Sequence, residues 1–285
     1  MSHVTLQSPA KLNLFLKVQS KRPDGYHNIV TVFQRISLSD RISFRSAPQK
    51  NIRIICNHPH VPVGPKNLVT KVAHILQKEF GIERGAVIKI QKNIPVAAGL
   101  AGGSSNAATA LLGFNKIWKL GLNRDKLLSY AQKIGSDVAF FLYDTSWALG
   151  TERGDRIKKL NIETKLWQIL VVPRIKIYSW KVYGGLKLQL TKMGDNANIL
   201  TRNLKKGNIL EVGRLLANDL EKEVIRLCPR LEKLKERLKS LNTKGVMVSG
   251  SGPSVFGLTA TEDEAKHIKS ILSKRFSQVF VVKTL

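Results

Sequence analysis

The stretch that most constrains this chain is a run of small residues at positions 95–106, with the sequence PVAAGLAGGSSN. The apolar pattern around it predicts a strand over residues 86–91 and a helix over residues 107–120. A glycine-rich loop at a helix N-terminus lets a bulky anion approach free backbone N–H groups at the positive end of the helix dipole. This stretch, here named the central loop, therefore predicts a phosphate site.

The central loop differs from the two best-known phosphate-binding patterns. The P-loop requires a lysine after its last glycine, and the central loop has none there. The central loop also lacks the G-x-G-x-x-G spacing. Ser104 and Ser105 can cap the following helix, or offer hydroxyls to a phosphate or its magnesium ion. The alternative interpretation is a flexible turn with an ordinary serine cap.

Two further sites carry polar groups that suit a binding cleft. Residues 12–18 alternate as a strand does, which places Lys11 and Asn13 side by side on one face. Asp137 stands between a turn and a buried apolar run, where a carboxylate can act as an acid or base. The alternatives are an edge strand with a solvent-facing Lys and Asn, and a turn aspartate that bonds its own backbone.

A tight turn at residues 22–25 is followed directly by Tyr26 and His27. An aromatic ring beside an imidazole can hold a nucleobase by stacking and hydrogen bonding. The alternative is a pair of surface side chains next to a hairpin.

The charge of the chain favours anionic partners. Lys and Arg number 47 against 20 Asp and Glu, a formal net charge of +27. Such an excess is compatible with nucleic acid, an anionic membrane surface or phosphorylated small molecules. The lysines are scattered, which indicates a solvated basic surface.

Other features set limits on location and metal binding. We expect a cytoplasmic protein, because no apolar run approaches the ~18 residues of a membrane span and no signal peptide is recognisable. Cys56 and Cys228 are expected to be reduced, buried thiols. We expect loop polarity at His58 and His60 and no metal site, because no acidic residue lies nearby and neither cysteine has metal-ligand spacing.

The coarse pattern predicts an α+β protein of two domains, residues 1–160 and 161–285. The first part is rich in strands, and the second reads helix, strand, strand, helix, strand around an antiparallel sheet. Further predictions are two strands at 29–36 and 41–45, helices at 67–80, 124–134 and 179–190, a mobile loop at 191–199, and a helical stretch at 208–241 that is broken at Pro229.

Three motifs in a fixed order make the chain resemble the GHMP kinases: SPAKLNL at 8–14, the central loop, and VSGSGPSVFG at 248–257, the C-terminal glycine loop. The resemblance implies an N-terminal domain like the second domain of ribosomal protein S5 and a ferredoxin-like C-terminal domain. It also implies transfer of the γ-phosphoryl group of ATP to an alcohol, with Mg²⁺.

Within the family, the chain is most similar to members that phosphorylate the 2-hydroxyl of a cytidine diphosphate derivative of methylerythritol, on the non-mevalonate route to isoprenoids. The segments that match those members are DGYH at 24–27, GSD at 135–137, GTERGD at 150–155 and NDLE at 218–221. The alternatives are a GHMP kinase for another small molecule, such as homoserine or an isoprenoid alcohol, or a basic RNA-binding protein on an S5-like scaffold. Beyond ATP and the small-molecule substrate we expect no nucleic acid or membrane partner, and a monomer or homodimer.

The resemblance also implies roles for single residues. Asp137 matches the catalytic aspartate that accepts the hydroxyl proton, and Lys11 matches its partnering lysine. Substrate-binding positions are Asn13, Tyr26, His27 and, as the second stacking ring, Tyr183. The ATP-binding positions are Asn67, Pro95, Val96, Ala97, Ala98, Gly99, Leu100, Ala101, Gly102, Gly103, Ser104 and Ser105.

Overall fold

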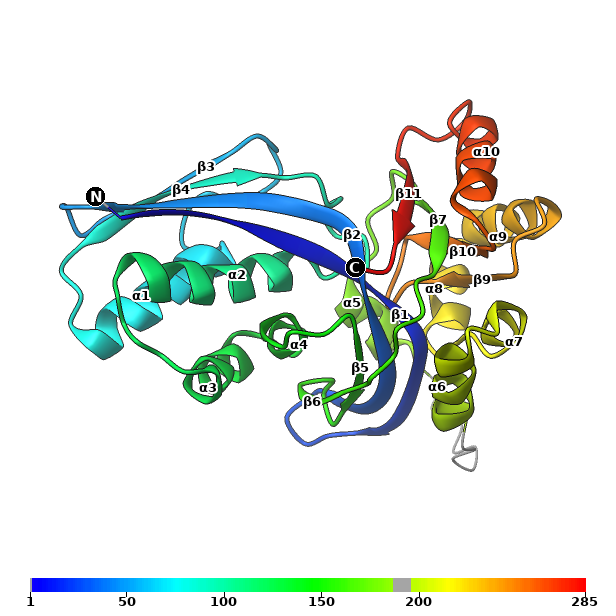
Figure 1. Cartoon of the computed structure of the whole chain (residues 1–285), viewed down its shortest axis with the longest axis horizontal. Helices are drawn as coiled ribbons and strands as arrows, with labels where there is room; N and C mark the ends of the chain where they lie inside the picture. Colours follow the sequence, from blue (N-terminus) through cyan, green and yellow to red (C-terminus); the bar gives the residue numbers. More distant parts are fainter. Residues whose placement is uncertain (1, 187–195) are drawn as a thin grey trace. The chain divides into compact units, whose positions relative to one another are not determined.

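The computed structural model describes residues 2–186 and 196–285, which form two compact units (Figure 1). The first unit consists of the described residues up to Ala10, together with Leu38–Val96 and Ala101–Asp144. The second unit holds Lys11–Ser37, Ala97–Leu100 and the described residues from Thr145 to Leu285. It thus combines residues from both sides of position 160, and the domain limits 1–160 and 161–285 remain a prediction.

Two long consecutive strands, β1 (His3–Lys21) and β2 (His27–Ala47), pair with each other and give residues to both units. Two separate strands were expected within β2, at 29–36 and 41–45. They form one strand because residues 37–40 continue the extended backbone without a turn.

The sheet of the first unit is covered by helices. Residues 41–47 of β2 pair antiparallel with β4 (Gly85–Gln91), and β3 (Ile52–Cys56) pairs parallel with β4. The helices of this unit, which lie on one side of the sheet in Figure 1, are α1 (Leu68–Phe80), α2 (Gly102–Ile117), α3 (Arg124–Ile134) and α4 (Val138–Leu142). Gly113 lets α2 approach β2 closely, since a Cβ there would lie 2.6 Å from the ring of Phe44.

Asparagine side chains cap two of these helices, which were predicted at residues 67–80 and 124–134. Oδ1 of Asn67 accepts the N–H of Val69, and Oδ1 of Asn123 accepts the N–H of Lys126. The helix after the central loop begins earlier than expected, at Gly102 and not at residue 107. Ala101 adopts a left-handed conformation with φ of 54° and starts the helix there, so residues 102–106 form its first turns.

The second unit contains two groups of strands. Residues 31–34 of β2 pair antiparallel with β5 (Trp147–Thr151), which also pairs antiparallel with β6 (Arg156–Lys159). A separate antiparallel sheet has the order β11-β7-β10-β9. Its strands are β7 (Trp167–Val171), β9 (Gly245–Val248), β10 (Val255–Thr259) and β11 (Val279–Lys283). Numbered in chain order this sheet reads 4-1-3-2, the order of a ferredoxin-like domain.

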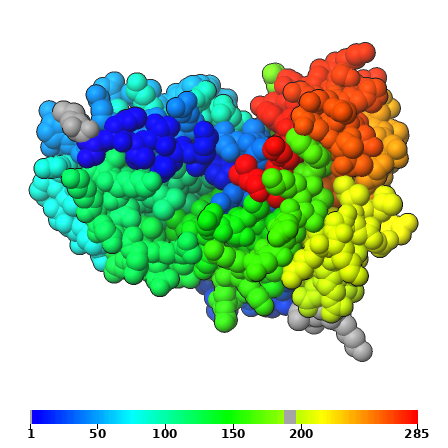
Figure 2. Space-filling view, in the orientation of Figure 1, coloured from blue at the N-terminus to red at the C-terminus, as the bar shows by residue number. Residues whose placement is uncertain are grey.

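The helices of the second unit differ in part from the prediction. They are α5 (Ser179–Gly184), α6 (Asn196–Lys206), α7 (Ile209–Arg214), α8 (Glu221–Leu227), α9 (Arg230–Ser240) and α10 (Glu262–Leu272). The stretch 208–241 is interrupted not only at Pro229 but also by the short strand β8 (Ala217–Asn218), which pairs with β1. Helices α6 and α7 lie next to each other at the surface of this unit (Figure 2).

Two predictions touch residues that the structure leaves undescribed. The helix expected over 179–190 ends at Gly184, and its residues 187–190 lie outside the described residues. In the loop expected over 191–199, residues 191–195 also lie outside them, whereas residues 196–199 are helical. Among the described helices, none combines the length and apolar composition needed to cross a membrane.

Candidate functional site

Lys11 and Asn13 are buried neighbours on β1, with exposed fractions of 5% and 1%. Nζ of Lys11 donates a hydrogen bond of 2.5 Å to Oδ1 of Asn13. Nδ2 of Asn13 donates to Oγ1 of Thr31 at 2.7 Å, and that hydroxyl donates to the carbonyl of Phe15. The solvent-facing edge strand is therefore the wrong alternative, because β1 lies between β2 and β8 and holds both side chains in a fixed chain of donors and acceptors.

Residues 97–100 of the central loop are held by hydroxyls of the C-terminal glycine loop. Oγ of Ser254 donates to the carbonyl of Ala98 at 2.5 Å, and Oγ of Ser249 donates to the carbonyl of Gly99 at 3.1 Å. The two backbones lie so close that a Cβ on Gly99 would stand 2.3 Å from the carbonyl oxygen of Ser249. Only glycine fits at position 99, where the backbone also has a φ of +73°.

The C-terminal glycine loop also reaches the Lys11–Asn13 pair. A Cβ on Gly250 would lie 3.2 Å from Oδ1 of Asn13 and 3.7 Å from Nζ of Lys11. The backbone N–H of Lys11 donates to the carbonyl of Leu100 at 3.2 Å. Parts of all three sequence motifs thus meet inside the second unit.

The first unit holds the rest of the central loop, including the N-terminus of α2. Ser105 is fully buried, and its hydroxyl lies 2.8 Å from the hydroxyl of Ser8. Nδ2 of Asn106 donates to Ser8 at 2.9 Å and to Oδ2 of Asp40 at 2.8 Å. Ser105 thus has a structural partner, whereas Ser104 is half-buried in the first turn of α2.

Asp40 is a buried charge beside the central loop that sequence reasoning did not identify. Its Oδ1 accepts the backbone N–H groups of Asn93 and Ile94, both at 2.8 Å, and its Oδ2 pairs with Nζ of Lys92. Burial lowers the pKa of Lys92, and the carboxylate of Asp40 acts in the opposite direction. The pair fixes the backbone where β4 leads into the central loop.

The other two predicted residues of the first unit occupy helix starts. Asp137 is half-buried immediately before α4. Asn67 caps α1 with its Oδ1 and donates from Nδ2 to the carbonyl of Pro62 at 2.6 Å. Because Lys11 belongs to the second unit and Asp137 to the first, their pairing stays a prediction, as does the role of Asn67 near adenine.

The predicted base-binding residues lie in the second unit. The rings of His27 and Tyr183 stack with centroids 5.1 Å apart, while Tyr26 is 50% exposed. The guanidinium of Arg153 lies 5.1 Å from the centroid of the Tyr26 ring. Tyr183 therefore faces the imidazole in this structure.

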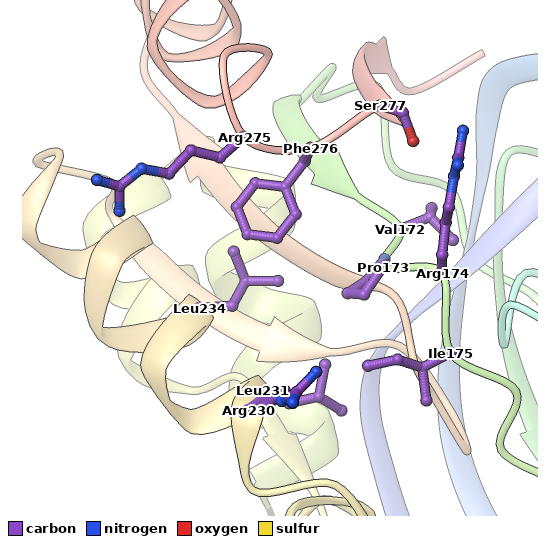
Figure 3. Close-up of a pocket in the computed structure, with 10 residues that line it drawn as sticks. All are labelled: Val172, Pro173, Arg174, Ile175, Arg230, Leu231, Leu234, Arg275, Phe276 and Ser277. Atoms are coloured by element: carbon purple, nitrogen blue, oxygen red, sulfur yellow. The ribbon is translucent and has the colours of Figure 1, made fainter.

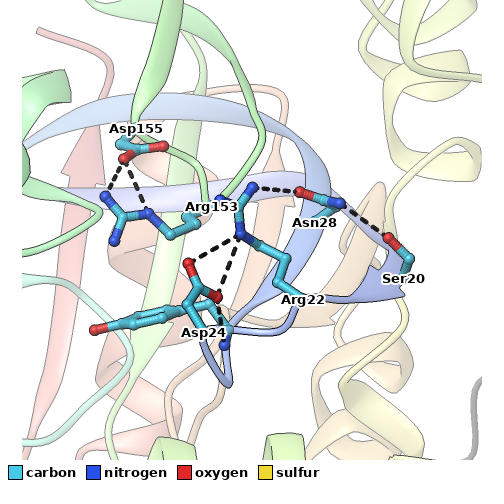
Figure 4. A network of polar contacts seen from close by, with 7 residues as sticks. Ser20, Arg22, Asp24, Asn28, Arg153 and Asp155 are labelled. Carbon is cyan, nitrogen blue, oxygen red and sulfur yellow. Dashed lines mark hydrogen bonds and ion pairs between the residues drawn. The ribbon is translucent and has the colours of Figure 1, made fainter.

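Two ion pairs and the hydrogen bonds linked to them lie around the turn at residues 22–25 (Figure 4). Arg153 donates to Oδ2 of Asp155 at 2.6 Å, and the same guanidinium lies near the ring of Tyr26. Arg22 binds Asp24 at 3.1 Å, and its Nη1 donates to Oδ1 of Asn28, which in turn bonds Ser20. The turn is thus tied to both strands that it joins.

Burial lowers the pKa of His27 below the ordinary 6.5, and the positive charge of Lys21 lowers it further. The lowered pKa favours the neutral imidazole at pH 7. In that state one ring nitrogen donates a hydrogen bond and the other accepts one.

Comparison with known proteins places this arrangement in a family. The family description "GHMP kinases N terminal domain" matches residues 67–145, and "GHMP kinases C terminal" matches residues 200–278. A 4-diphosphocytidyl-2-C-methyl-D-erythritol kinase from Geobacillus kaustophilus is 39% identical, over 99% of this chain and 97% of its own. The chain belongs to the GHMP kinase family.

Two further comparisons agree with the assignment of this chain to the GHMP kinase family. A relative from Geobacter metallireducens with the same name is 40% identical over 93% of this chain and 92% of its own. The crystal structure of a 4-(cytidine 5'-diphospho)-2C-methyl-D-erythritol kinase superposes with a TM-score of 0.84 at 28% identity, and 98% of each chain is covered. The expected α+β GHMP kinase fold is thereby confirmed.

This GHMP kinase also has a pocket whose walls include none of its predicted site residues. The pocket has a volume of about 460 Å³ in the second unit (Figure 3). Its walls are Val172, Pro173, Arg174, Ile175, Arg230, Leu231, Leu234, Arg275, Phe276 and Ser277. Within the described part of the chain, no group of three or more His, Cys, Asp or Glu is placed to hold a metal.

Sequence reasoning missed several residues that shape the site. Ser249 and Ser254 belong to the C-terminal glycine loop, but their sequence did not predict that their hydroxyls donate to carbonyls of the central loop. Asp40 and Lys92 gave no signal, because a charged residue near a strand end usually faces water. Cys56 and Cys228 are free thiols as predicted, but only Cys228 is buried.

Proposed function

We propose that this protein transfers the γ-phosphoryl group of ATP to the 2-hydroxyl of 4-diphosphocytidyl-2-C-methyl-D-erythritol, forming the 2-phosphate and ADP in the cytoplasm. The observation that carries the proposal is the set of relatives that bear this enzyme's name at 36–40% identity over at least 93% of the chain. The meeting of three motif segments in the second unit supports it, because phosphoryl transfer depends mainly on positioning and charge neutralisation.

Asp137 and Lys11 are proposed to handle the acceptor hydroxyl. Asp137 takes the proton of the 2-hydroxyl as that oxygen bonds to the γ-phosphorus, and the bond to the ADP oxygen breaks. Lys11 supplies a cation that favours the ionised hydroxyl, and Asn13 orients the substrate. The buried hydrogen bond between Lys11 and Asn13 supports these roles, because it keeps both groups in one orientation.

The central loop is proposed to hold the phosphates of ATP with backbone N–H groups, and Asn67 to lie near adenine. Ser104 carries an oxygen donor of the kind that Mg²⁺ prefers, and it is better suited than Ser105, whose hydroxyl is engaged by Ser8. Magnesium bound with ATP would neutralise charge on the phosphate oxygens.

The cytosine is proposed to bind at His27 by hydrogen bonds, with Tyr26 and Tyr183 as stacking rings. The neutral imidazole supports this role, because cytosine presents both a donor and acceptors on its pairing edge. Tyr183 stacks on His27, so its ring already lies beside the side chain proposed to bind the base.

An acceptor panel tests the proposed substrate. The purified protein is given ATP, Mg²⁺ and, in separate reactions, the cytidyl substrate, homoserine or mevalonate, and kcat/KM is measured for each. We expect turnover of the cytidyl substrate to exceed the others by orders of magnitude. Preferred turnover of homoserine or mevalonate would assign the protein to another branch of the family.

The RNA-binding alternative is tested by filter binding at two salt concentrations. A basic RNA-binding protein predicts tight binding that falls steeply with salt. We expect weak binding and an undiminished kinase activity when RNA is present.

A further inference from the structure

The NDLE segment (residues 218–221) is one of the segments that match the family, and none of its residues has been given a role above. It lies against β1 in the second unit. Asn218 pairs with Leu16 in the parallel β8–β1 contact. The N–H of Asp219 donates to the carbonyl of Leu16 at 2.9 Å, and Oδ2 of Asp219 accepts the N–H of Val18 at 2.8 Å. The segment is thus fixed to the strand that carries Lys11.

Two side chains of the same segment form hydrogen bonds with the C-terminal glycine loop. Nδ2 of Asn218 donates to the carbonyl of Val248 at 2.9 Å and to the carbonyl of Gly250 at 2.8 Å. Oε1 of Glu221 accepts the N–H of Val248 at 2.8 Å, and its Oε2 pairs with Lys235. Asn218 is therefore the side chain that bonds the loop at Gly250 itself.

Gly250 is the point where this loop meets the proposed acceptor site. A Cβ there would lie 3.2 Å from Oδ1 of Asn13 and 3.7 Å from Nζ of Lys11, so the backbone packs directly against the pair. The adjacent Ser249 holds Gly99 of the central loop. A shift of Gly250 would therefore displace the groups proposed to hold the acceptor and the phosphates together.

We propose that Asn218 is a positioning residue for phosphoryl transfer. It fixes the Gly250 peptide, and through it the orientation of Lys11 and Asn13, without touching substrate. This role rests on the proposed function of Lys11. A purely structural tie predicts lower thermal stability with normal turnover, whereas positioning predicts a loss in kcat.

The test compares Asn218→Ala with Asn115→Ala at a temperature well below both melting points. Asn115 is a matched control, since its side chain donates to the carbonyl of Leu122 and accepts the N–H of Leu122, both at 2.9 Å, and it has no proposed role in binding or catalysis. We expect Asn218→Ala to lower kcat by up to about 10²-fold with a much smaller change in KM. Asn115→Ala is expected to lower the melting temperature and leave kcat unchanged.

A double-mutant cycle gives a second readout that does not depend on one variant. Gly250→Ala disturbs the same contact from the loop side. If Asn218 acts through Gly250, the double variant loses no more kcat than the worse single variant, so the effects are non-additive. Additive losses in kcat would overturn the proposal.

Two further outcomes are distinguishable. An active wild-type protein with a normal kcat for Asn218→Ala overturns the positioning role alone. A wild-type protein that does not phosphorylate the cytidyl substrate overturns the proposed function, and the positioning role with it.

Discussion

The ammonium group of Lys11 donates a hydrogen bond of 2.5 Å to Oδ1 of Asn13, and both side chains are buried on one strand. A buried cation needs compensating partners, and Lys11 also lies 5.3 Å from the ring centroid of Phe33. The charge is thus kept in a fixed place at the junction of three motif segments. Fixed charge in a water-poor site is what stabilises a developing negative charge most strongly.

Replacing Lys11 by Met keeps the aliphatic stem and removes the cation. We expect kcat to fall on the order of 10²–10³-fold, as for other fixed charge donors in active sites. Lys17→Met, on the same strand, is the control and is expected to retain turnover. A Lys11→Met enzyme with normal kcat would exclude a catalytic role for this cation.

Asp137→Asn removes the proposed base without a change of size. We expect kcat to fall on the order of 10²–10⁴-fold, since this is the range of general base catalysis, while ATP binding is retained. Steady-state kinetics and a nucleotide-binding titration measure the two effects. Near-normal turnover would show that Asp137 does not accept the proton.

Gly99→Ala tests the contact between the two glycine-rich loops. The added methyl group would meet the carbonyl oxygen of Ser249 at 2.3 Å, so the loops must separate. We expect a raised KM for ATP together with a lower kcat. Gly64→Ala is the control, because a Cβ there meets no atom within 4 Å. Equal kinetics for the two variants would contradict the close contact.

The titration of His27 tests the electrostatics of the proposed base site. Its pKa is lowered from 6.5 by burial and by Lys21, so the folded state binds the proton less readily than the unfolded state. Stability contributed by the neutral ring is therefore complete above pH 6.5 and is lost as the pH falls through the folded pKa. An NMR titration of the imidazole measures the folded pKa directly.

Two variants check the cause of the lowered pKa of His27. Tyr183→Ala exposes the ring and Lys21→Gln removes the nearby charge, so each is expected to raise the pKa toward 6.5. A wild-type pKa at or above 6.5 would contradict the packing of Tyr183 on the imidazole.

Asp40→Asn leaves the ammonium of Lys92 buried without its counter-charge. Breaking a buried pair in this way costs about 3–5 kcal/mol, and we expect the free energy of unfolding in urea to fall by that amount. Lys50→Ala breaks the exposed pair with Glu83 and should cost less than about 1 kcal/mol. Similar losses in both variants would show that the Asp40 pair is effectively solvated.

Local sequence patterns predicted much of the fold because each depended on near neighbours. The helices at residues 67–80 and 124–134 followed from their local apolar patterns, and the alternation at residues 12–18 indicated a strand. The early start of α2 was not predictable, because it depends on Ala101 adopting a positive φ that alanine rarely takes. The length of β2 and the short strand β8 depend on pairing with distant strands.

The site was predicted as motifs but not as contacts. The order of three motifs pointed to one family, yet nothing local showed that Ser249 bonds Gly99 or that Asn218 bonds Gly250. The stacking of Tyr183 on His27 also joins residues far apart in the chain. Contacts of this kind follow from tertiary packing.

The central claim is that this protein phosphorylates the 2-hydroxyl of the cytidyl substrate. Phosphorus NMR of the reaction with ATP and Mg²⁺ tests it directly. We predict a new phosphomonoester signal that couples to no carbon-bound proton, because the 2-hydroxyl is tertiary, with one ADP formed per product. Absence of that signal, or a phosphoryl group on another hydroxyl, would contradict the account.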